Sequence, residues 1–178
     1  MNCVVLVGFP GCGKTTIGKK LASHLGFQFY DLDNEIENHY CISIPDFFKK
    51  YGETYFRICE HQILLSLLNK NNVVIATGGG APCYFASMQL IHTYAISIYI
   101  CLSPKSLVER LFYSKKMRPL IFGSDIHSLT KYVFSSFLSR EKFYKQATMT
   151  VKGENLSIPF LTDKVQRLLD NSLQIIDM

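Results

Sequence analysis

The chain has 178 residues, of which 48% are hydrophobic and 19% charged, with a formal net charge of +5. This length fits one domain, and this much apolar material excludes an intrinsically disordered chain. No apolar run approaches the roughly 18 residues of a membrane span, and the apolar start lacks the basic region of a signal peptide. The modest charge suits small anionic substrates as well as nucleic acid. No basic stripe with interleaved aromatic residues favours nucleic acid, and we expect no nucleic-acid or membrane partner.

Cysteine usage indicates the compartment. The six cysteines form no C-x-x-C pair and no metal-ligand spacing. Most lie in apolar surroundings, where a free cysteine behaves as a small hydrophobic residue. We therefore expect a reducing compartment, the cytoplasm. The scattered histidines are expected to be neither metal ligands nor catalytic bases.

Hydrophobic patterning predicts strands that alternate with helices. Val4–Gly8 is an almost wholly apolar run, typical of a strand buried on both faces of a parallel sheet. In chain order we expect a strand at Val4–Gly8, a helix at Lys14–His24, a strand at Phe27–Leu32, helices at Asn34–Tyr40, Ser43–Gly52 and from Thr54 to the break at Asn71, a strand at Val73–Thr77, a helix at Tyr84–His92, a strand at Ala95–Leu102, a helix at Pro104–Phe112, a loop at Tyr113–Asp125, a helix at Leu129–Tyr144, a strand at Thr148–Val151 and a helix at Ile158–Leu169. This alternation predicts an α/β fold with a parallel sheet.

Residues 8–15 match the phosphate-loop pattern G-x-x-x-x-G-K-S/T, directly after a strand and at the start of a helix. In such a loop, backbone N–H groups and a helix N-terminus bind phosphate oxygens. We expect Lys14 to face the nucleotide and neutralise the β- and γ-phosphates, and the Thr15 hydroxyl to ligate Mg²⁺. For Cys12 we favour a small side chain that points away from the ligand over a reactive thiol.

Two carboxylates follow the second predicted strand. Period-two alternation would place Asp31 and Asp33 on one side of this strand, beyond its carboxyl end, where open α/β sheets bind ligands. One could hold hydrated Mg²⁺ and the other could receive a hydroxyl proton. Alternatively, Asp33 only caps the helix that starts at Asn34.

Arg57 shares a helix face with Glu60 and can also reach Glu53, so these side chains can form ion pairs. The alternative is a solvated surface pair. Arg140 falls on a helical stripe with Val133 and Phe137. A guanidinium on such a core-facing line needs an anionic partner, either a protein carboxylate or a substrate carboxylate.

Two loops complete the candidate site. Gly78-Gly79-Gly80 follows the third strand, where glycines permit close backbone approach to a ligand, although a simple turn would also explain them. The segment 115–119 concentrates positive charge, as a lid over phosphates would, although a solvated charge run is the alternative.

Together these motifs resemble the shikimate kinases, in the nucleoside monophosphate kinase-like branch of P-loop proteins. The motifs are residues 8–15, Asp31-x-Asp33, Phe56-Arg57-x-x-Glu60, Thr77-Gly78-Gly79-Gly80-Ala81, Arg118-Pro119-Leu120 and Arg140-x-x-x-Tyr144. The resemblance covers nearly the whole chain and implies a single kinase domain over 1–178. It implies a P-loop NTPase-type three-layer fold with a five-stranded parallel sheet of order 2-3-1-4-5, helices on both faces, a shikimate-binding region at about 33–61 and a mobile lid at about 113–125.

The resemblance further implies ATP-dependent phosphorylation of the 3-hydroxyl of shikimate, giving shikimate 3-phosphate and ADP on the way to chorismate and the aromatic amino acids. The implied cofactor is Mg²⁺, bound by Thr15 and, through water, by Asp31; we expect a monomer. The implied catalytic residues are Lys14, Asp33 and Arg118. The implied ATP-binding residues are Gly11, Cys12, Gly13, Lys14, Thr15, Thr16, Arg110 and Arg118. The implied shikimate-binding residues are Asp33, Arg57, Gly79, Gly80 and Arg140.

Two departures from the family pattern concern adenine. The stretch between Arg110 and Arg118 is one residue longer than usual, and 152–155 lacks the arginine often found before the last helix. Alternative functions are another small-molecule P-loop kinase, of gluconate or nucleotide type, and a nucleotide-binding regulator without catalysis. Thr15-Thr16 after Lys14 is unlike adenylate kinases, which typically have glycine after this lysine. Asp33 argues against a pure binder, which needs no residue at an acceptor hydroxyl.

Overall fold

The computed structural model describes residues 2–114 and 125–174, with side chains to residue 171. In chain order the elements are β1 (Cys3–Val7), α1 (Lys14–Leu25), β2 (Gln28–Asp31), α2 (Leu32–Tyr40), α3 (Ile44–Leu68), β3 (Val73–Ala76), the short 3₁₀ helix η1 (Ala81–Cys83), α4 (Ser87–Tyr94), β4 (Ile96–Cys101), α5 (Pro104–Phe112), α6 (Ile126–Tyr144), β5 (Met149–Lys152) and α7 (Ile158–Gln174). The alternation of strands and helices predicted from the sequence is confirmed.

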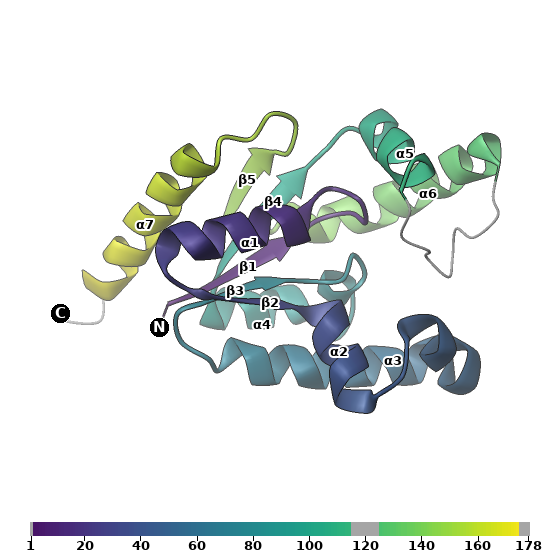
Figure 1. Cartoon of the computed structure of the whole chain (residues 1–178), viewed down its shortest axis with the longest axis horizontal. Coiled ribbons are helices and arrows are strands. Elements are labelled where there is room, and N and C mark those ends of the chain that lie inside the picture. The colour runs from purple at the N-terminus through teal and green to yellow at the C-terminus, as the bar shows by residue number, and fades with distance from the viewer. Residues whose placement is uncertain (1, 115–124, 175–178) are drawn as a thin grey trace.

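The strands form one parallel sheet of order β2-β3-β1-β4-β5, as the family resemblance implies. The central strand β1 is buried along its whole length, which explains its unbroken apolar sequence. Helices cover both faces: α1 and α7 pack together in front of the sheet, while α4 and α6 lie behind it (Figure 1). The segments that follow β1, β2 and β3 therefore meet at the carboxyl edge of the sheet, where ligands bind in such folds.

Several element boundaries differ from the sequence predictions. The two helices expected on either side of Gly52 follow one another directly as α3, with a non-helical kink at Gly52 (φ 76°, ψ 172°). The helix expected from Tyr84 begins at Ser87, because Phe85 and Ala86 adopt left-handed backbone angles. The helix expected from Leu129 begins three residues earlier, where Asp125 caps it by accepting a hydrogen bond from the Ser128 amide.

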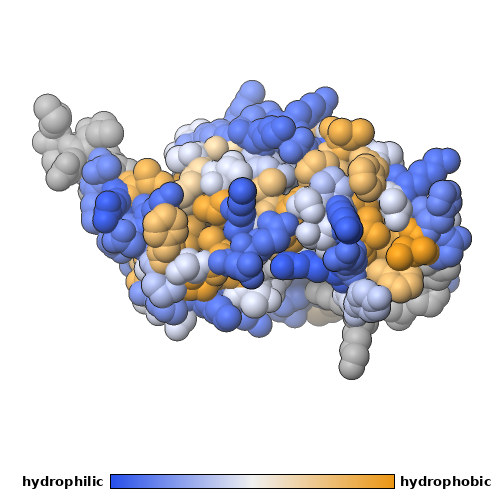
Figure 2. All heavy atoms as spheres, turned by 90° about the horizontal axis from the view of Figure 1, so that it is seen from above, coloured by the Kyte–Doolittle hydropathy of each residue, from blue (hydrophilic) through white to orange (hydrophobic). Residues whose placement is uncertain are grey.

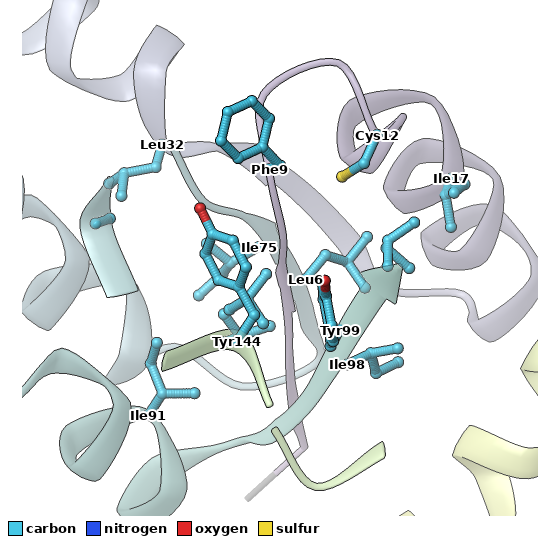
Figure 3. Close-up of a cluster of buried hydrophobic side chains, with 14 of the residues drawn as sticks. Leu6, Phe9, Cys12, Ile17, Leu32, Ile75, Ile91, Ile98, Tyr99 and Tyr144 are labelled. Atoms are coloured by element: carbon cyan, nitrogen blue, oxygen red, sulfur yellow. The ribbon is translucent and has the colours of Figure 1, made fainter. Parts of the chain in front are cut away.

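The core reaches up to the phosphate loop. Phe9 and Cys12, both in that loop, are buried. Beneath them lie Tyr99 and Tyr144, whose hydroxyls point toward the carboxyl edge of the sheet (Figure 3). The loop is thus anchored by apolar side chains to the core, which fixes its backbone for ligand binding.

The surface is mixed in hydropathy, and the cysteines are unpaired. Hydrophilic and hydrophobic residues are interspersed on the face seen from above (Figure 2). Within the two described segments, no helix combines the length and apolar character needed to cross a bilayer. All six cysteines are free thiols.

Candidate active site

The phosphate loop runs from the end of β1 into α1. Gly11 and Gly13 have φ values of 89° and 100°, in a region that side chains disfavour, so the loop needs glycine at both positions. Gly13 is the N-cap of α1, whose first turn contains no acidic residue. The uncapped N-terminus of α1 therefore fits the anion site that the sequence predicts.

Lys14 is the first residue of α1 and bonds back to the phosphate loop. Its Nζ donates hydrogen bonds to the backbone carbonyls of Gly8 at 2.7 Å and Phe9 at 3.1 Å. The side chain is buried, because its ammonium group bonds to the loop's own carbonyls. The expected contact of Lys14 with the β- and γ-phosphates stays a prediction. The Cys12 thiol lies 3.7 Å from the same Nζ and is fully buried, as favoured for a side chain pointing away from the ligand.

The two residues expected at the metal are in contact. The Thr15 hydroxyl, exposed at the start of α1, donates to Asp31 Oδ2 at 2.6 Å. A hydroxyl and a carboxylate are oxygen donors of the kind Mg²⁺ prefers, and Mg²⁺ usually completes its shell with water and phosphate. Among the described residues, no group of three His, Cys, Asp or Glu side chains could hold a metal alone. The pair therefore fits a metal that arrives with a nucleotide.

Asp33 is not on the strand with Asp31, which corrects the alternation argument. Asp31 ends β2 and is also the N-cap of α2, accepting a hydrogen bond from the Asp33 amide at 3.2 Å. This cap starts the helix at Leu32, so Asp33 lies in its first turn and the alternative cap at Asp33 is also wrong. Asp33 still reaches the site, because a Cβ placed on Gly78 would lie 2.7 Å from its Oδ1.

Arg57 is held by two carboxylates on α3. Its Nη1 donates to Glu60 Oε2 at 2.7 Å, and its Nη2 and Nε donate to Glu53 Oε1 at 3.0 and 3.2 Å. The Arg57 and Glu60 side chains are only 8% and 4% exposed, so the pair is not the solvated surface alternative. The ion pairing of Arg57 predicted from the sequence is confirmed.

The protonation of Glu60 depends on two opposing effects. Burial raises the pKa of Glu60 to about 7, against the charge and hydrogen bond of Arg57, which lower it, while the nearby charges of Asp33 and Glu53 raise it further. The same carboxylates hold the pKa of Arg57 above its usual range, although burial acts to lower it. Arg57 is therefore a permanent buried cation beside an acid that can change charge near neutral pH.

The glycine loop after β3 brings these groups together. A Cβ on Gly80 would lie 2.6 Å from Arg57 Nη2, and one on Gly79 would lie 2.4 Å from the Pro10 ring. Close approach to Arg57 and to the phosphate loop is therefore the reason for glycine here, and a simple turn does not explain it.

Arg140, on α6, contacts the phosphate loop. Its Cζ lies 5.8 Å from the centroid of the Phe9 ring, and the side chain is half-buried, although the stripe residues Val133 and Phe137 are buried. Four residues on, the Tyr144 hydroxyl donates to the Gly79 carbonyl. Arg140 therefore lies beside the phosphate loop, about one helical turn from the residue that bonds to the glycine loop.

The structure also places the residues expected at the nucleotide, with one exception. Arg110 is exposed on α5 and its Nη1 donates to the Cys12 carbonyl at 3.5 Å, beside the phosphate loop. Thr16 is exposed in the first turn of α1. Arg118 and residues 115–124 of the expected lid lie outside the described residues.

Tyr84 is a site residue that the sequence analysis missed. Its hydroxyl donates to Glu53 Oε1 at 3.1 Å, and its ring centroid lies 4.6 Å from Arg57 Cζ. The available signal is an aromatic residue shortly after the glycine loop, although the sequence pattern places it at the start of a helix that in the structure begins at Ser87.

A parallel sheet of this order, a phosphate loop with an adjoining Thr–Asp pair, and a second loop beside a buried arginine define a P-loop kinase. The shikimate kinase family model matches residues 10–172. The chain therefore belongs to the shikimate kinase family, which decides against the gluconate-type, nucleotide-type and non-catalytic alternatives.

Individual relatives agree. A shikimate kinase from Azobacteroides pseudotrichonymphae is 40% identical over 84% of this chain and 88% of its own length. The crystal structure of shikimate kinase from Bacteroides thetaiotaomicron has a TM-score of 0.88 at 32% identity, over 95% of this chain and 98% of that chain. Shikimate kinase from Acinetobacter baumannii in complex with shikimate has a TM-score of 0.79 at 31% identity, over 98% and 94% of the two chains.

Proposed function

We propose that this shikimate kinase transfers the γ-phosphoryl group of ATP to the 3-hydroxyl of shikimate, giving shikimate 3-phosphate and ADP, with Arg57 and Arg140 binding the substrate carboxylate. The observation that carries this assignment is Arg57, a buried guanidinium held by Glu60 against Gly80 at the carboxyl edge of the sheet. An arginine fork matches the planar geometry of a carboxylate. We assign shikimate to Asp33, Arg57, Gly79, Gly80 and Arg140.

For the chemistry, we assign the acceptor hydroxyl to Asp33. Its carboxylate lies beside Gly78, next to the loop that would seat the substrate, so it could orient the hydroxyl and receive its proton. Lys14 and the loop amides would stabilise charge on the transferring phosphoryl group, where electrostatic stabilisation supplies most of the catalysis. The family resemblance adds Arg118 to this group.

For the nucleotide, we assign the phosphates to Gly11, Cys12, Gly13, Lys14, Thr15 and Thr16, with Arg110 beside them. Mg²⁺ would be held by Thr15 and, through water, by Asp31, which the hydrogen bond between these two side chains supports. Bound there, Mg²⁺ would neutralise phosphate charge.

We further propose that residues 1–178 form one kinase domain with a substrate region at about 33–61 and a lid at about 113–125. We also propose that the chain acts as a monomer in the cytoplasm, without a nucleic-acid or membrane partner. The six free thiols support a reducing compartment.

The test of this function is a coupled assay of ADP release with shikimate, gluconate and AMP offered in parallel. We expect shikimate to support a rate far above the other two at equal concentration. A higher rate with gluconate or AMP would overturn the substrate assignment.

A further inference from the structure

One carboxylate oxygen of Glu53 accepts three hydrogen bonds in the candidate active site. Glu53 Oε1 accepts hydrogen bonds from Arg57 Nε and Nη2 and from the Tyr84 hydroxyl, at 3.2, 3.0 and 3.1 Å. The Nε–Nη2 edge of a guanidinium carries two parallel N–H donors, which is the edge that a carboxylate ligand can engage through two bonds. In this structure a protein carboxylate occupies that edge.

The two carboxylates on Arg57 differ in their environment. The Glu60 side chain is 4% exposed, whereas the Glu53 side chain is 48% exposed. Glu60 therefore holds Arg57 from the protein interior, while Glu53 approaches it from the solvent side. Glu53 is therefore the more readily displaced of the two carboxylates, because about half of its side chain already lies in water.

Arg140 acts on the same carboxylate. Burial raises the pKa of Glu53, but the hydrogen bond and charge of Arg57 outweigh this effect, and Tyr84 and the charge of Arg140 lower the pKa further. Both guanidinium groups that the proposed function assigns to the substrate carboxylate thus already stabilise the negative charge of Glu53.

We propose that Glu53 is a substitute for the substrate carboxylate: it occupies the outer edge of Arg57 in the unliganded site, Tyr84 holds it there, and the substrate carboxylate displaces it. This inference rests on the proposed role of Arg57 as a substrate clamp. It makes Glu53 a specificity residue, because only a ligand with its own carboxylate can replace the bonds that Arg57 loses.

Calorimetric titration with shikimate tests the displacement. Glu53→Gln removes the competing charge, and we expect shikimate to bind about three- to tenfold more tightly. Glu53→Asp keeps the charge but shortens the side chain, so tighter binding is expected here as well. Weaker or unchanged shikimate binding in both variants would overturn the proposal. Tighter binding in Glu53→Gln but not in Glu53→Asp would indicate a long-range charge effect, which would also overturn the displacement.

A ligand without a carboxylate provides a second readout. The shikimate analogue with a hydroxymethyl group in place of the carboxylate cannot displace Glu53, so Glu53→Gln should leave its affinity unchanged. An equal gain for the analogue and for shikimate would contradict the proposal. Tyr84→Phe keeps the ring on Arg57 and removes only the hydroxyl, and we expect about a twofold gain for shikimate.

Two further variants complete the design. Asp163→Asn breaks another i,i+4 ion pair with an arginine, Arg167, on α7, and should leave shikimate affinity unchanged; a matching gain there would contradict a local effect. Arg57→Ala separates the proposed substrate clamp from the proposed displacement of Glu53. Unchanged shikimate binding in Arg57→Ala would refute the clamp itself, whereas weaker binding there without a gain in the Glu53 variants would refute only the displacement.

Discussion

The Tyr144 hydroxyl, at the end of α6, donates a hydrogen bond to the backbone carbonyl of Gly79, in the loop after β3. The Tyr144 side chain is fully buried. This bond ties the helix that carries Arg140 to the loop that lies against Arg57. The two arginines assigned to the substrate are thereby held in a fixed relation by a buried residue.

Tyr144→Phe keeps the ring but removes the donor. The Gly79 carbonyl then loses a buried partner, which should cost about 1–3 kcal/mol in the free energy of unfolding. We also expect weaker shikimate binding, with unchanged ATP affinity, because only the spacing of the two arginines is loosened. Urea denaturation and calorimetry measure both effects.

Tyr99 offers a matched control, because its ring lies 5.4 Å from that of Tyr144. The Tyr99 hydroxyl is buried and has no hydrogen-bond partner among the described residues. Tyr99→Phe should therefore be neutral or stabilising. Equal losses in the two variants would mean that the hydroxyl of Tyr144 has no special role.

Lys14→Met tests the phosphate cradle. The variant loses the charge that stabilises the transferring phosphoryl group, so kcat should fall by at least about 10²-fold. Lys20→Met, an exposed cation on the same helix, is the control and should keep wild-type turnover. A Lys14→Met enzyme that retained more than about a tenth of the wild-type rate would count against this role.

Contiguous motifs were the most predictable part of this protein. The phosphate loop is one short segment whose glycines, lysine and threonine have fixed local roles, so its position after a buried strand could be read directly. The pairing of Arg57 with Glu60 follows from helical spacing. The strand order came from the family resemblance, because parallel pairing between distant segments leaves no local signal.

Other features could not be predicted, for identifiable reasons. Strand alternation misplaced Asp33, because Asp31 caps a helix that begins one residue after it. The contact of Tyr84 with Glu53 joins residues 31 positions apart, and Tyr84 is extended rather than helical because the helix begins only after the left-handed residues Phe85 and Ala86. Lys14 bonds to carbonyls of its own loop, a contact that the phosphate-loop motif does not specify.

Stability should depend on pH through Glu60. Its pKa is about 7 in the folded protein and ordinarily 4.5, so between these values the unfolded chain releases a proton that the folded protein retains. Glu60 therefore stabilises the fold at low pH, and this contribution is lost as pH rises through about 7.

Glu60→Gln removes this titration. From pH 5 to pH 8 the free energy of unfolding of the wild type should fall relative to Glu60→Gln by about 1–3 kcal/mol, measured by urea denaturation. Glu109→Gln, at an exposed glutamate of α5, is the control, and the pH dependence of its free energy of unfolding should match that of the wild type. Parallel curves for Glu60→Gln and the wild type would show that Glu60 is charged throughout this range.

The carboxylate clamp is tested most directly at its two arginines. Charge-assisted hydrogen bonds contribute roughly 1.5–3 kcal/mol each, so Arg57→Ala or Arg140→Ala should weaken shikimate binding by about 10- to 150-fold. ATP affinity should barely change, because neither side chain belongs to the phosphate loop. Lysine at either position should restore binding only in part, since a point charge cannot reproduce the planar fork.

Arg140 gives the cleaner measurement of the two. Arg57→Ala leaves Glu60 buried without its cation, and breaking such a pair costs about 3–5 kcal/mol of stability, so its binding data need a check of the folded fraction. Arg140 is half-buried over Phe9, and its removal leaves no buried carboxylate unpaired among its described contacts. Calorimetric titration of Arg140→Ala with shikimate and with ATP therefore isolates the substrate contact. Wild-type affinity for shikimate in this variant would remove Arg140 from the clamp and leave Arg57 as its remaining assigned guanidinium.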